Sequence, residues 1–255
     1  MDMRTYRFAG RDGVELACRE VGPESGRPLI LLHGFMGTGS DWIERARVVG
    51  PLIEQGYRLV LPDLRGHGES ARLHDPAAYP PDVLADDGLA LIEQLGFGDG
   101  DYGLGGYSLG ARVVVRMLAR GAAPLRAIVA GQGLAKVSGP QGGGMNQRVL
   151  SALVDGTPIE PGSADAQMAH WISQFGADPQ ALLYVLKSFV PTPEDALRQI
   201  TLSTLVAIGD GDERSDADEL AALLPNSRFI RVPGSHGSAF AAPEFGAAIA
   251  TFLAE

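Results

Sequence analysis

The sequence lacks the features that mark secreted and membrane-bound proteins. It has a single cysteine, Cys18, so no internal disulfide can form and nothing argues for an oxidising compartment. The N-terminus shows no basic patch followed by an apolar stretch, and no apolar run is long enough to span a bilayer. We therefore expect a cytoplasmic protein that has no membrane partner.

Basic side chains are also in the minority. The chain has 21 lysines and arginines against 31 acidic side chains, and its formal net charge is -10. An acidic surface repels phosphate backbones, so nucleic acid is a poor candidate partner. The sequence contains no P-loop and no His, Cys and carboxylate cluster with metal-ligand spacing. We expect a monomer or homodimer that acts on a small-molecule substrate and needs no metal or cofactor.

What the sequence does contain is an alternation of short apolar segments and helical patterns. Two segments that flank Asp12-Gly13, a hairpin turn signal, open the chain. Most of the later segments are continuous apolar runs, which are typical of strands buried on both faces. The strand-like segments are residues 4–8, 14–21, 28–32, 58–61, 102–106, 125–130, 202–209 and 228–232. This alternation predicts an α/β fold with a mostly parallel central sheet and helices on both faces.

One long stretch, residues 131–201, breaks the alternation because it has helical patterns and no clear strand. A structureless loop of that length is improbable in a compact protein. We therefore predict a core formed by residues 1–134 and 202–255, with a helical cap at residues 135–201 inserted after the sixth strand.

A candidate nucleophile lies between a strand pattern and a helix pattern. Residues 106–110 read Gly-Tyr-Ser-Leu-Gly, and a serine at such a sharp turn needs small neighbours. The following helix N-terminus offers free N–H groups to a developing oxyanion. We predict that Ser108 is the nucleophile and that the amide of Leu109 is one oxyanion donor.

A second oxyanion donor has to come from a neighbouring loop. The segment 33–37, His-Gly-Phe-Met-Gly, follows the first long buried strand and is placed for this role. We assign the second donor to the amide of Phe35, with the amide of Met36 as the alternative. His33 is interpreted as a structural brace of the loop.

The candidate base and acid follow the last two strands. Among five histidines, only His236 combines a loop after a strand, glycine neighbours and a place after the acid in the chain. In the segment Gly209–Glu213 we choose Asp212 as the acid, because the glycine-rich turn should return the later residue to the sheet edge, and we keep Asp210 as the alternative. In this scheme His236 exchanges the proton of Ser108 while Asp212 fixes its tautomer.

These residues, in the chain order Ser108, Asp212 and His236 and with the loop 33–37 upstream, resemble the α/β-hydrolase superfamily. The resemblance covers nearly the whole chain and includes the loop at residues 63–70. It implies a capped, carboxylesterase-like serine hydrolase that cleaves a small carboxylic ester or related acyl compound through an acyl-enzyme intermediate.

Other functions stay open at this stage. Residues 106–110, the loop 33–37 and the nearby Asp41-Trp42 are also similar to the menaquinone-pathway synthase, which eliminates pyruvate with the same triad. That similarity implies a lyase or C–C hydrolase whose anionic substrate needs arginines in the cap, where Arg148, and less obviously Arg198, are available. A third alternative is a non-catalytic α/β-hydrolase that binds a ligand.

The substrate pocket should lie between the sheet edge and the cap. Its candidate lining residues are Phe35, Met36, Tyr107, Leu109, Trp171 and Phe175, with Arg148 as a candidate contact for an anion. Packing within the cap would explain Trp171 and Phe175 equally well, because they are one helical turn apart. We expect the pocket to take short-to-medium apolar acyl groups.

Overall fold

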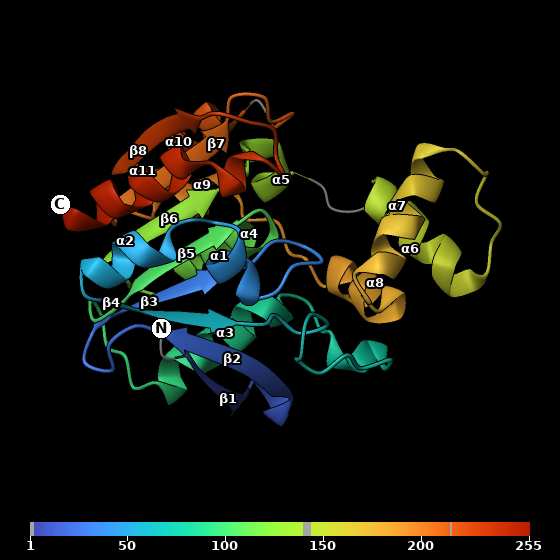
Figure 1. The fold of residues 1–255 in the computed structure, drawn as a ribbon, viewed down its shortest axis with the longest axis horizontal. Coiled ribbons are helices and arrows are strands. Elements are labelled where there is room, and N and C mark those ends of the chain that lie inside the picture. The colour runs from blue at the N-terminus through green and yellow to red at the C-terminus, as the bar shows by residue number, and fades with distance from the viewer. Residues whose placement is uncertain (1–2, 140–143, 215) are drawn as a thin grey trace.

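The computed structural model describes residues 3–139, 144–214 and 216–255, and an eight-stranded sheet forms its centre (Figure 1). The strands are β1 Met3–Ala9, β2 Glu15–Val21, β3 Arg27–Leu32, β4 Tyr57–Pro62, β5 Gly103–Tyr107, β6 Arg126–Ala130, β7 Thr204–Gly209 and β8 Ser227–Val232. Their order is β1-β2-β4-β3-β5-β6-β7-β8, with antiparallel pairing of β1 with β2 and of β2 with β4 and parallel pairing elsewhere. The predicted fold class, a mostly parallel sheet with helices, is confirmed.

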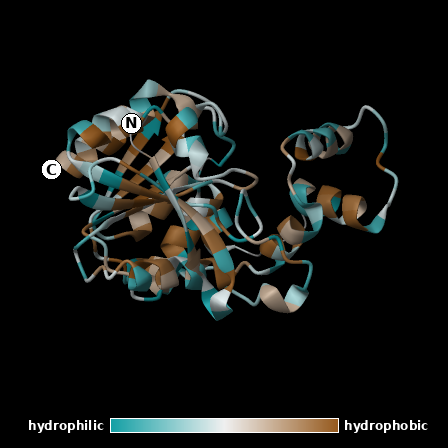
Figure 2. Cartoon of the chain, turned by 60° about the horizontal axis from the view of Figure 1, so that its bottom comes forward, coloured by the Kyte–Doolittle hydropathy of each residue, from teal (hydrophilic) through white to brown (hydrophobic). Residues whose placement is uncertain are grey.

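The helices cover both faces of this sheet. They are α1 Ser40–Glu44, α2 Val49–Glu54, α3 Val83–Gln94, α4 Leu109–Ala119, α5 Leu134–Ser138, α6 Met145–Asp155, α7 Ala164–Gln174, α8 Pro179–Lys187, α9 Glu194–Arg198, α10 Ala217–Leu223 and α11 Pro243–Ala254. Helices α3, α4 and α10 share one apolar core with the sheet, and α1, α2 and α11 share the other. In Figure 2 the strands between them are predominantly hydrophobic. Within the described ranges, no helix is both long enough and apolar enough to cross a membrane.

Residues 40–54 contain two short helices, α1 and α2, and not one long helix. Arg47, between the two helices, has a φ of 48°, and a left-handed residue cannot continue a right-handed helix. Gly39 is the N-cap of α1 and offers no side-chain cap, and Ser40 is the first helical residue. The carboxylate of Asp41 accepts the N–H of Thr38 at 2.9 Å instead.

Helices α5 to α9 lie between β6 and β7 in the sequence. Helices α5 and α9 pack against α4 and α10, whereas α6, α7 and α8 form a group beside the sheet (Figure 1). This group has its own small apolar core of Val149, Leu150, Ile172, Leu182 and Leu183, against which Phe35 and Met36 also pack. The loop after β3 is therefore in contact with helices that are distant from it in the sequence. The proposed domain boundaries at residues 135 and 201 stay a prediction.

Candidate active site

Ser108 lies at the sharp turn between β5 and α4. Its backbone has φ 54° and ψ -111°, a conformation that side chains rarely adopt and that is typical of a nucleophile at a strand-to-helix turn. The glycines on either side leave room for this turn. A Cβ on Gly106 would lie 2.3 Å from the carbonyl carbon of Gly110, and one on Gly110 would lie 2.1 Å from the carbonyl oxygen of Leu32. The Gly-x-Ser-x-Gly pattern therefore follows from steric requirements.

The structure brings Ser108, His236 and Asp212 together at the carboxyl ends of β5, β8 and β7. Nε2 of His236 is 2.9 Å from the hydroxyl of Ser108, and Nδ1 is 2.7 Å from Oδ2 of Asp212. In the neutral imidazole that fits both contacts, Nδ1–H donates to Asp212 and Nε2 accepts the hydroxyl proton of Ser108. This is the hydrogen-bonding order of a serine, base and acid relay.

Asp210, the alternative acid, has a different partner. Its Oδ1 accepts the N–H of Gly234 at 2.8 Å, which ties the turn after β7 to the loop that carries His236. The Asp212 side chain is fully buried and contacts the imidazole of His236, whereas the Glu213 side chain is 87% exposed. Of the three neighbouring acids, Asp212 is the one in contact with His236.

The surroundings favour a neutral imidazole and an ionised carboxylate. Burial lowers the pKa of His236, the positive charge of Arg214 lowers it further, and the hydrogen bond to Asp212 opposes both. Burial opposes ionisation of Asp212, but hydrogen bonds from His236 and from the N–H of Arg214 outweigh it, so that the pKa of Asp212 is lowered. His236 is thus placed to act as a base at neutral pH.

Backbone amides near Ser108 are available to an oxyanion. Among the described residues, the N–H groups of Phe35, Met36 and Leu109 donate no hydrogen bond within the protein, so the choice between Phe35 and its alternative Met36 stays a prediction. The loop that carries Phe35 is braced by His33, whose Nε2 accepts the N–H of Leu64 at 2.9 Å while Nδ1–H donates to the carbonyl of Gly34 at 2.8 Å. Burial lowers the pKa of His33, which is consistent with this neutral form.

The loop at residues 63–70 packs against the loop that carries Phe35. Asp63 accepts the N–H groups of Gly39 at 2.7 Å and Glu69 at 2.8 Å, and it pairs with Arg19 at 2.8 Å. The ring of His67 is buried and meets the ring of Phe35 edge to face at 5.7 Å. These contacts give the loop a structural role.

A cavity with two lobes opens around Ser108, between the sheet edge and the helices α7 and α8. Both lobes share five lining residues: Phe35, Met36, Ser108, Trp171 and His236. The aromatic lobe, about 380 Å³ in volume, adds Tyr107, Phe175 and Phe240 among its walls. The cationic lobe, about 620 Å³ in volume, adds Arg112, Lys136 and Arg214, with Glu213 as an acidic neighbour.

Most of the predicted pocket residues line this cavity. Met36, Tyr107, Trp171 and Phe175 do so, and Trp171 and Phe175 form an edge-to-face pair with ring centroids 4.8 Å apart. Their side chains are 41% and 58% exposed, so they are not core residues of the inserted helices. Leu109 is buried at the start of α4 instead.

The structure does not bring the predicted arginines to the cavity. Arg148 makes two hydrogen bonds of 2.7 Å to Asp165 on the surface of the inserted helices and lines neither lobe. Arg198 pairs with Glu194 and Asp195, its neighbours in α9.

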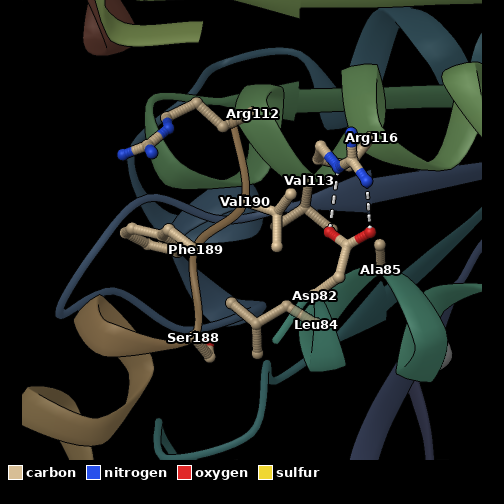
Figure 3. Close-up of a pocket in the computed structure, with 9 residues that line it drawn as sticks. All are labelled: Asp82, Leu84, Ala85, Arg112, Val113, Arg116, Ser188, Phe189 and Val190. Atoms are coloured by element: carbon tan, nitrogen blue, oxygen red, sulfur yellow. Dashed lines mark hydrogen bonds and ion pairs between the residues drawn. The ribbon is translucent and has the colours of Figure 1, made fainter. Parts of the chain in front are cut away.

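Three other cationic residues, Arg112, Lys136 and Arg214, line the cavity instead. Arg112 is four residues after Ser108 and so one turn along the same helix, a spacing that could have pointed to it. In Figure 3, Arg116 turns toward Asp82, whereas the guanidinium of Arg112 extends away from that pair, beside Phe189. The Arg112 guanidinium lies 4.1 Å from the Phe189 ring centroid.

No metal site accompanies these residues. Within the described part of the chain, no group of three or more His, Cys, Asp or Glu side chains is arranged to hold a metal ion. The chemistry that the site itself offers is a hydroxyl, an imidazole and a carboxylate beside two amide donors.

Comparisons with known proteins identify the family. A family model described as the alpha/beta hydrolase fold matches residues 27–138. A non-heme haloperoxidase from Rhodococcus erythropolis is 30% identical, over 89% of this chain and 90% of that protein. A 2-succinyl-6-hydroxy-2,4-cyclohexadiene-1-carboxylate synthase from Yersinia pestis is 36% identical, over 39% of this chain and 36% of that protein.

A solved structure shares the fold over its full length. The esterase EaEST from Exiguobacterium antarcticum superimposes with a TM-score of 0.76, at 20% identity, over 98% of this chain and 99% of that one. The topology, the strand-to-helix turn at Ser108 and these similarities agree. The chain belongs to the α/β-hydrolase family.

Proposed function

We propose that the protein is a serine hydrolase that cleaves a small carboxylic ester or related acyl compound through an acyl-enzyme intermediate. The observation that carries this proposal is the continuous relay from the Ser108 hydroxyl through His236 to Asp212, with contacts of 2.9 and 2.7 Å. The 2.9 Å contact places the nucleophile within hydrogen-bonding reach of its base.

The geometry supports a two-step reaction. Neutral His236 takes the proton of Ser108 as its oxygen attacks the substrate carbonyl, and the amides of Phe35 and Leu109 stabilise the resulting oxyanion. His236 then gives the proton to the leaving alcohol, and the ester bond breaks. In the second step the same imidazole takes a proton from water, whose oxygen attacks the acyl carbon. The bond between the acyl group and Ser108 then breaks, the carboxylic acid leaves, and His236 returns the proton to Ser108. Asp212 stabilises the imidazolium in both steps.

The aromatic lobe suits the apolar part of such a substrate. Tyr107, Trp171, Phe175 and Phe240 place ring surfaces beside Ser108, and burying apolar groups against rings stabilises a complex. We propose that this lobe takes a short-to-medium acyl or alcohol group.

The first prediction tests the nucleophile with p-nitrophenyl acetate and butyrate. Replacing Ser108→Ala or His236→Ala should lower kcat by about 10⁴- to 10⁶-fold, and the double variant should lose little more because triad members act as a unit. Ser173→Ala, an exposed serine on α7, is the control and should keep wild-type rates. The wild-type protein should also react covalently with a fluorophosphonate at Ser108.

Unchanged turnover in Ser108→Ala would contradict the proposal. Saturable binding of a small molecule without turnover by the wild-type protein would favour the ligand-binding alternative.

The cationic lobe favours a second candidate function. Arg112, Lys136 and Arg214 face the same cavity as Ser108, and guanidinium and ammonium groups recognise carboxylates. The partial similarity to the Yersinia pestis synthase points in the same direction. The second candidate is therefore a lyase or C–C hydrolase that uses the same relay on an anionic substrate.

The second prediction separates the two candidates by substrate charge. For p-nitrophenyl butyrate and p-nitrophenyl hemisuccinate, similar in length but different in charge, the second candidate predicts a higher kcat/KM for the acid. Arg112→Gln should lower the acid-to-neutral ratio of kcat/KM by about 10- to 100-fold, the loss of one charged hydrogen bond. Arg148→Gln, on the surface of α6, is the matched control and should keep the ratio.

Elimination has a direct readout. Release of pyruvate from an enolpyruvyl ether acid, followed by a lactate dehydrogenase assay, would support the lyase. A ratio that favours the neutral ester in wild type and in Arg112→Gln alike would count against an anionic substrate.

A further inference from the structure

We propose that Arg214 is a positioning residue for the acid of the relay: it holds one carboxylate oxygen of Asp212 so that the other faces His236. Neither the family resemblance nor the triad pattern assigns Arg214 a role. The inference rests on the proposed function for its catalytic meaning, but the contacts that carry it do not depend on turnover.

The two oxygens of Asp212 have separate partners. Oδ1 accepts the guanidinium Nη1–H of Arg214 at 3.0 Å and the backbone N–H of Arg214 at 3.1 Å. Oδ2 accepts Nδ1–H of His236 at 2.7 Å. Rotation of the carboxylate would break the contacts at both oxygens, so Arg214 fixes the plane in which Asp212 meets the imidazole.

Burial gives these contacts weight. The Asp212 side chain is 0% exposed and the Arg214 side chain is 19% exposed, so solvent screens their attraction less than it screens a surface pair. Glu213 competes poorly for the same guanidinium, because its carboxylate is 3.9 Å away and 87% exposed. The guanidinium of Arg214 therefore pairs with Asp212 rather than with Glu213.

Arg214 also adds a positive charge beside the base. The charged and titratable groups around His236 come from several elements. They are Asp212, Glu213 and Arg214 after β7, Tyr107 and Ser108 at the turn after β5, Arg112 on α4, Lys136 on α5, and Asp41, Glu44 and Arg45 at α1, which line the aromatic lobe with His236. Arg214 lowers the pKa of His236, whereas Asp212 and Glu213 raise it.

Each change of charge in this set has a defined sign. Removing the charge of Arg214 should raise the pKa of His236, so that the base becomes protonated at a higher pH. Removing the charge of Glu213 should lower that pKa. A residue at position 214 that only packed against the loop, without a charge effect, would leave the pKa of His236 unchanged when it is replaced.

The experiment titrates His236 by NMR in the wild-type chain and in Arg214→Gln, Arg214→Lys and Glu213→Gln, with His236→Gln to assign the resonance. Arg214→Gln keeps a hydrogen-bond donor near Asp212 but loses the charge, and its His236 should titrate at higher pH. Arg214→Lys should restore the wild-type titration because it restores the charge. Glu213→Gln should shift it the opposite way.

Kinetics provide the second readout. The ratio of kcat/KM at pH 5.5 to that at pH 8 should fall by about two- to five-fold in Arg214→Gln, as expected for loss of one nearby charge, and return toward the wild-type ratio in Arg214→Lys. The effect should appear in kcat more than in KM, because Arg214 acts through the relay. Circular dichroism establishes that each variant is folded.

An unchanged His236 titration in folded Arg214→Gln would overturn the inference. Equal shifts in Arg214→Lys and Arg214→Gln would also overturn it, since charge would then not be the cause. The NMR titration can be repeated in a Ser108→Ala background, so a chain that hydrolyses no ester still tests Arg214. Failure of the proposed function and failure of this inference are therefore distinguishable.

Discussion

Asp210 and Asp212 are two residues apart, yet the structure gives them different partners. Asp212 contacts the imidazole of His236, while Asp210 holds the backbone N–H of Gly234. The third prediction is that Asp212→Asn lowers kcat by about 10⁴-fold, because the tautomer of His236 is no longer fixed. Asp210→Asn, the matched control, keeps its acceptor oxygen for Gly234 and should cost less than about ten-fold in a p-nitrophenyl ester assay.

An inactive Asp210→Asn beside an active Asp212→Asn would reverse the assignment of the acid.

The pKa of His236 determines how activity responds to acid. Only the neutral imidazole can accept the proton of Ser108, so kcat/KM should fall as pH decreases through the pKa of His236 in the free enzyme. Burial and Arg214 lower that pKa, so the fourth prediction places the midpoint of the fall below the ordinary histidine value of about 6.5. A kcat/KM profile with an ester that does not titrate in this range measures it. A midpoint above 6.5 would show that Asp212 outweighs burial.

At the scale of residues, sequence patterns pointed to the relay but not to the cations around it. Ser108 and His236 stand out because glycines and strand ends mark their positions. For Arg112 the only such signal is its spacing of four residues from Ser108, and Arg214 has none, since an arginine in a helix or loop usually faces solvent. The position of Arg214 in the cavity wall follows only from the folded structure.

At the scale of elements, all eight strands were predictable. Buried parallel strands are continuous apolar runs, and glycine, proline or charged residues bound them. The break between α1 and α2 was not predictable, because Arg47 adopts a left-handed conformation that its side chain type does not announce. Two short helices satisfy the same apolar pattern as one long helix would.

The turn between β5 and α4 supports a prediction about two glycines that both lie in helices. Gly110→Ala should lower the free energy of unfolding by about 1–3 kcal/mol, because its Cβ would lie 2.1 Å from the carbonyl oxygen of Leu32. At Gly50→Ala in α2, nothing apart from the neighbouring residues lies within 4 Å of the new Cβ, but that Cβ meets the ring of Pro51, which offsets the gain in helix propensity, so stability should change by less than about 1 kcal/mol. Urea unfolding of both variants makes this fifth test. Equal responses at the two positions would mean that β3 and α4 separate to admit the methyl group.

At the scale of the whole molecule, the buried histidines make the fold sensitive to acid. Burial, together with the nearby His33, lowers the pKa of His67 to about 3, and burial lowers the pKa of His33 as well. Below about pH 6.5 the unfolded chain would therefore bind protons at these two histidines, whereas the folded chain keeps them neutral. The free energy of unfolding should then decrease as the pH falls below that value. Acid unfolding of the wild-type protein should accordingly begin while the surface carboxylates are still ionised.

The overall architecture followed from the sequence, whereas the shape of the cavity did not. The alternation of elements implies a parallel sheet, and the carboxyl ends of its strands bring distant loops to one edge. How α6, α7 and α8 rest beside that edge depends on side-chain packing with Phe35 and Met36, and no periodicity in the sequence encodes such contacts. Trp171 and Phe175 are an example. Apolar residues one helical turn apart are expected in a packed core and in a cavity wall alike, so their spacing does not distinguish the two.

The proposed reacting groups and part of the cavity wall come from different parts of the chain. Ser108, Asp212 and His236 stand on the sheet, while Trp171 and Phe175 belong to helices inserted between β6 and β7. A chimera that exchanges only this insertion for that of a relative should therefore keep the reaction and change only the part of the substrate range that Trp171 and Phe175 determine, because Tyr107, Arg112 and Phe240 stay in place.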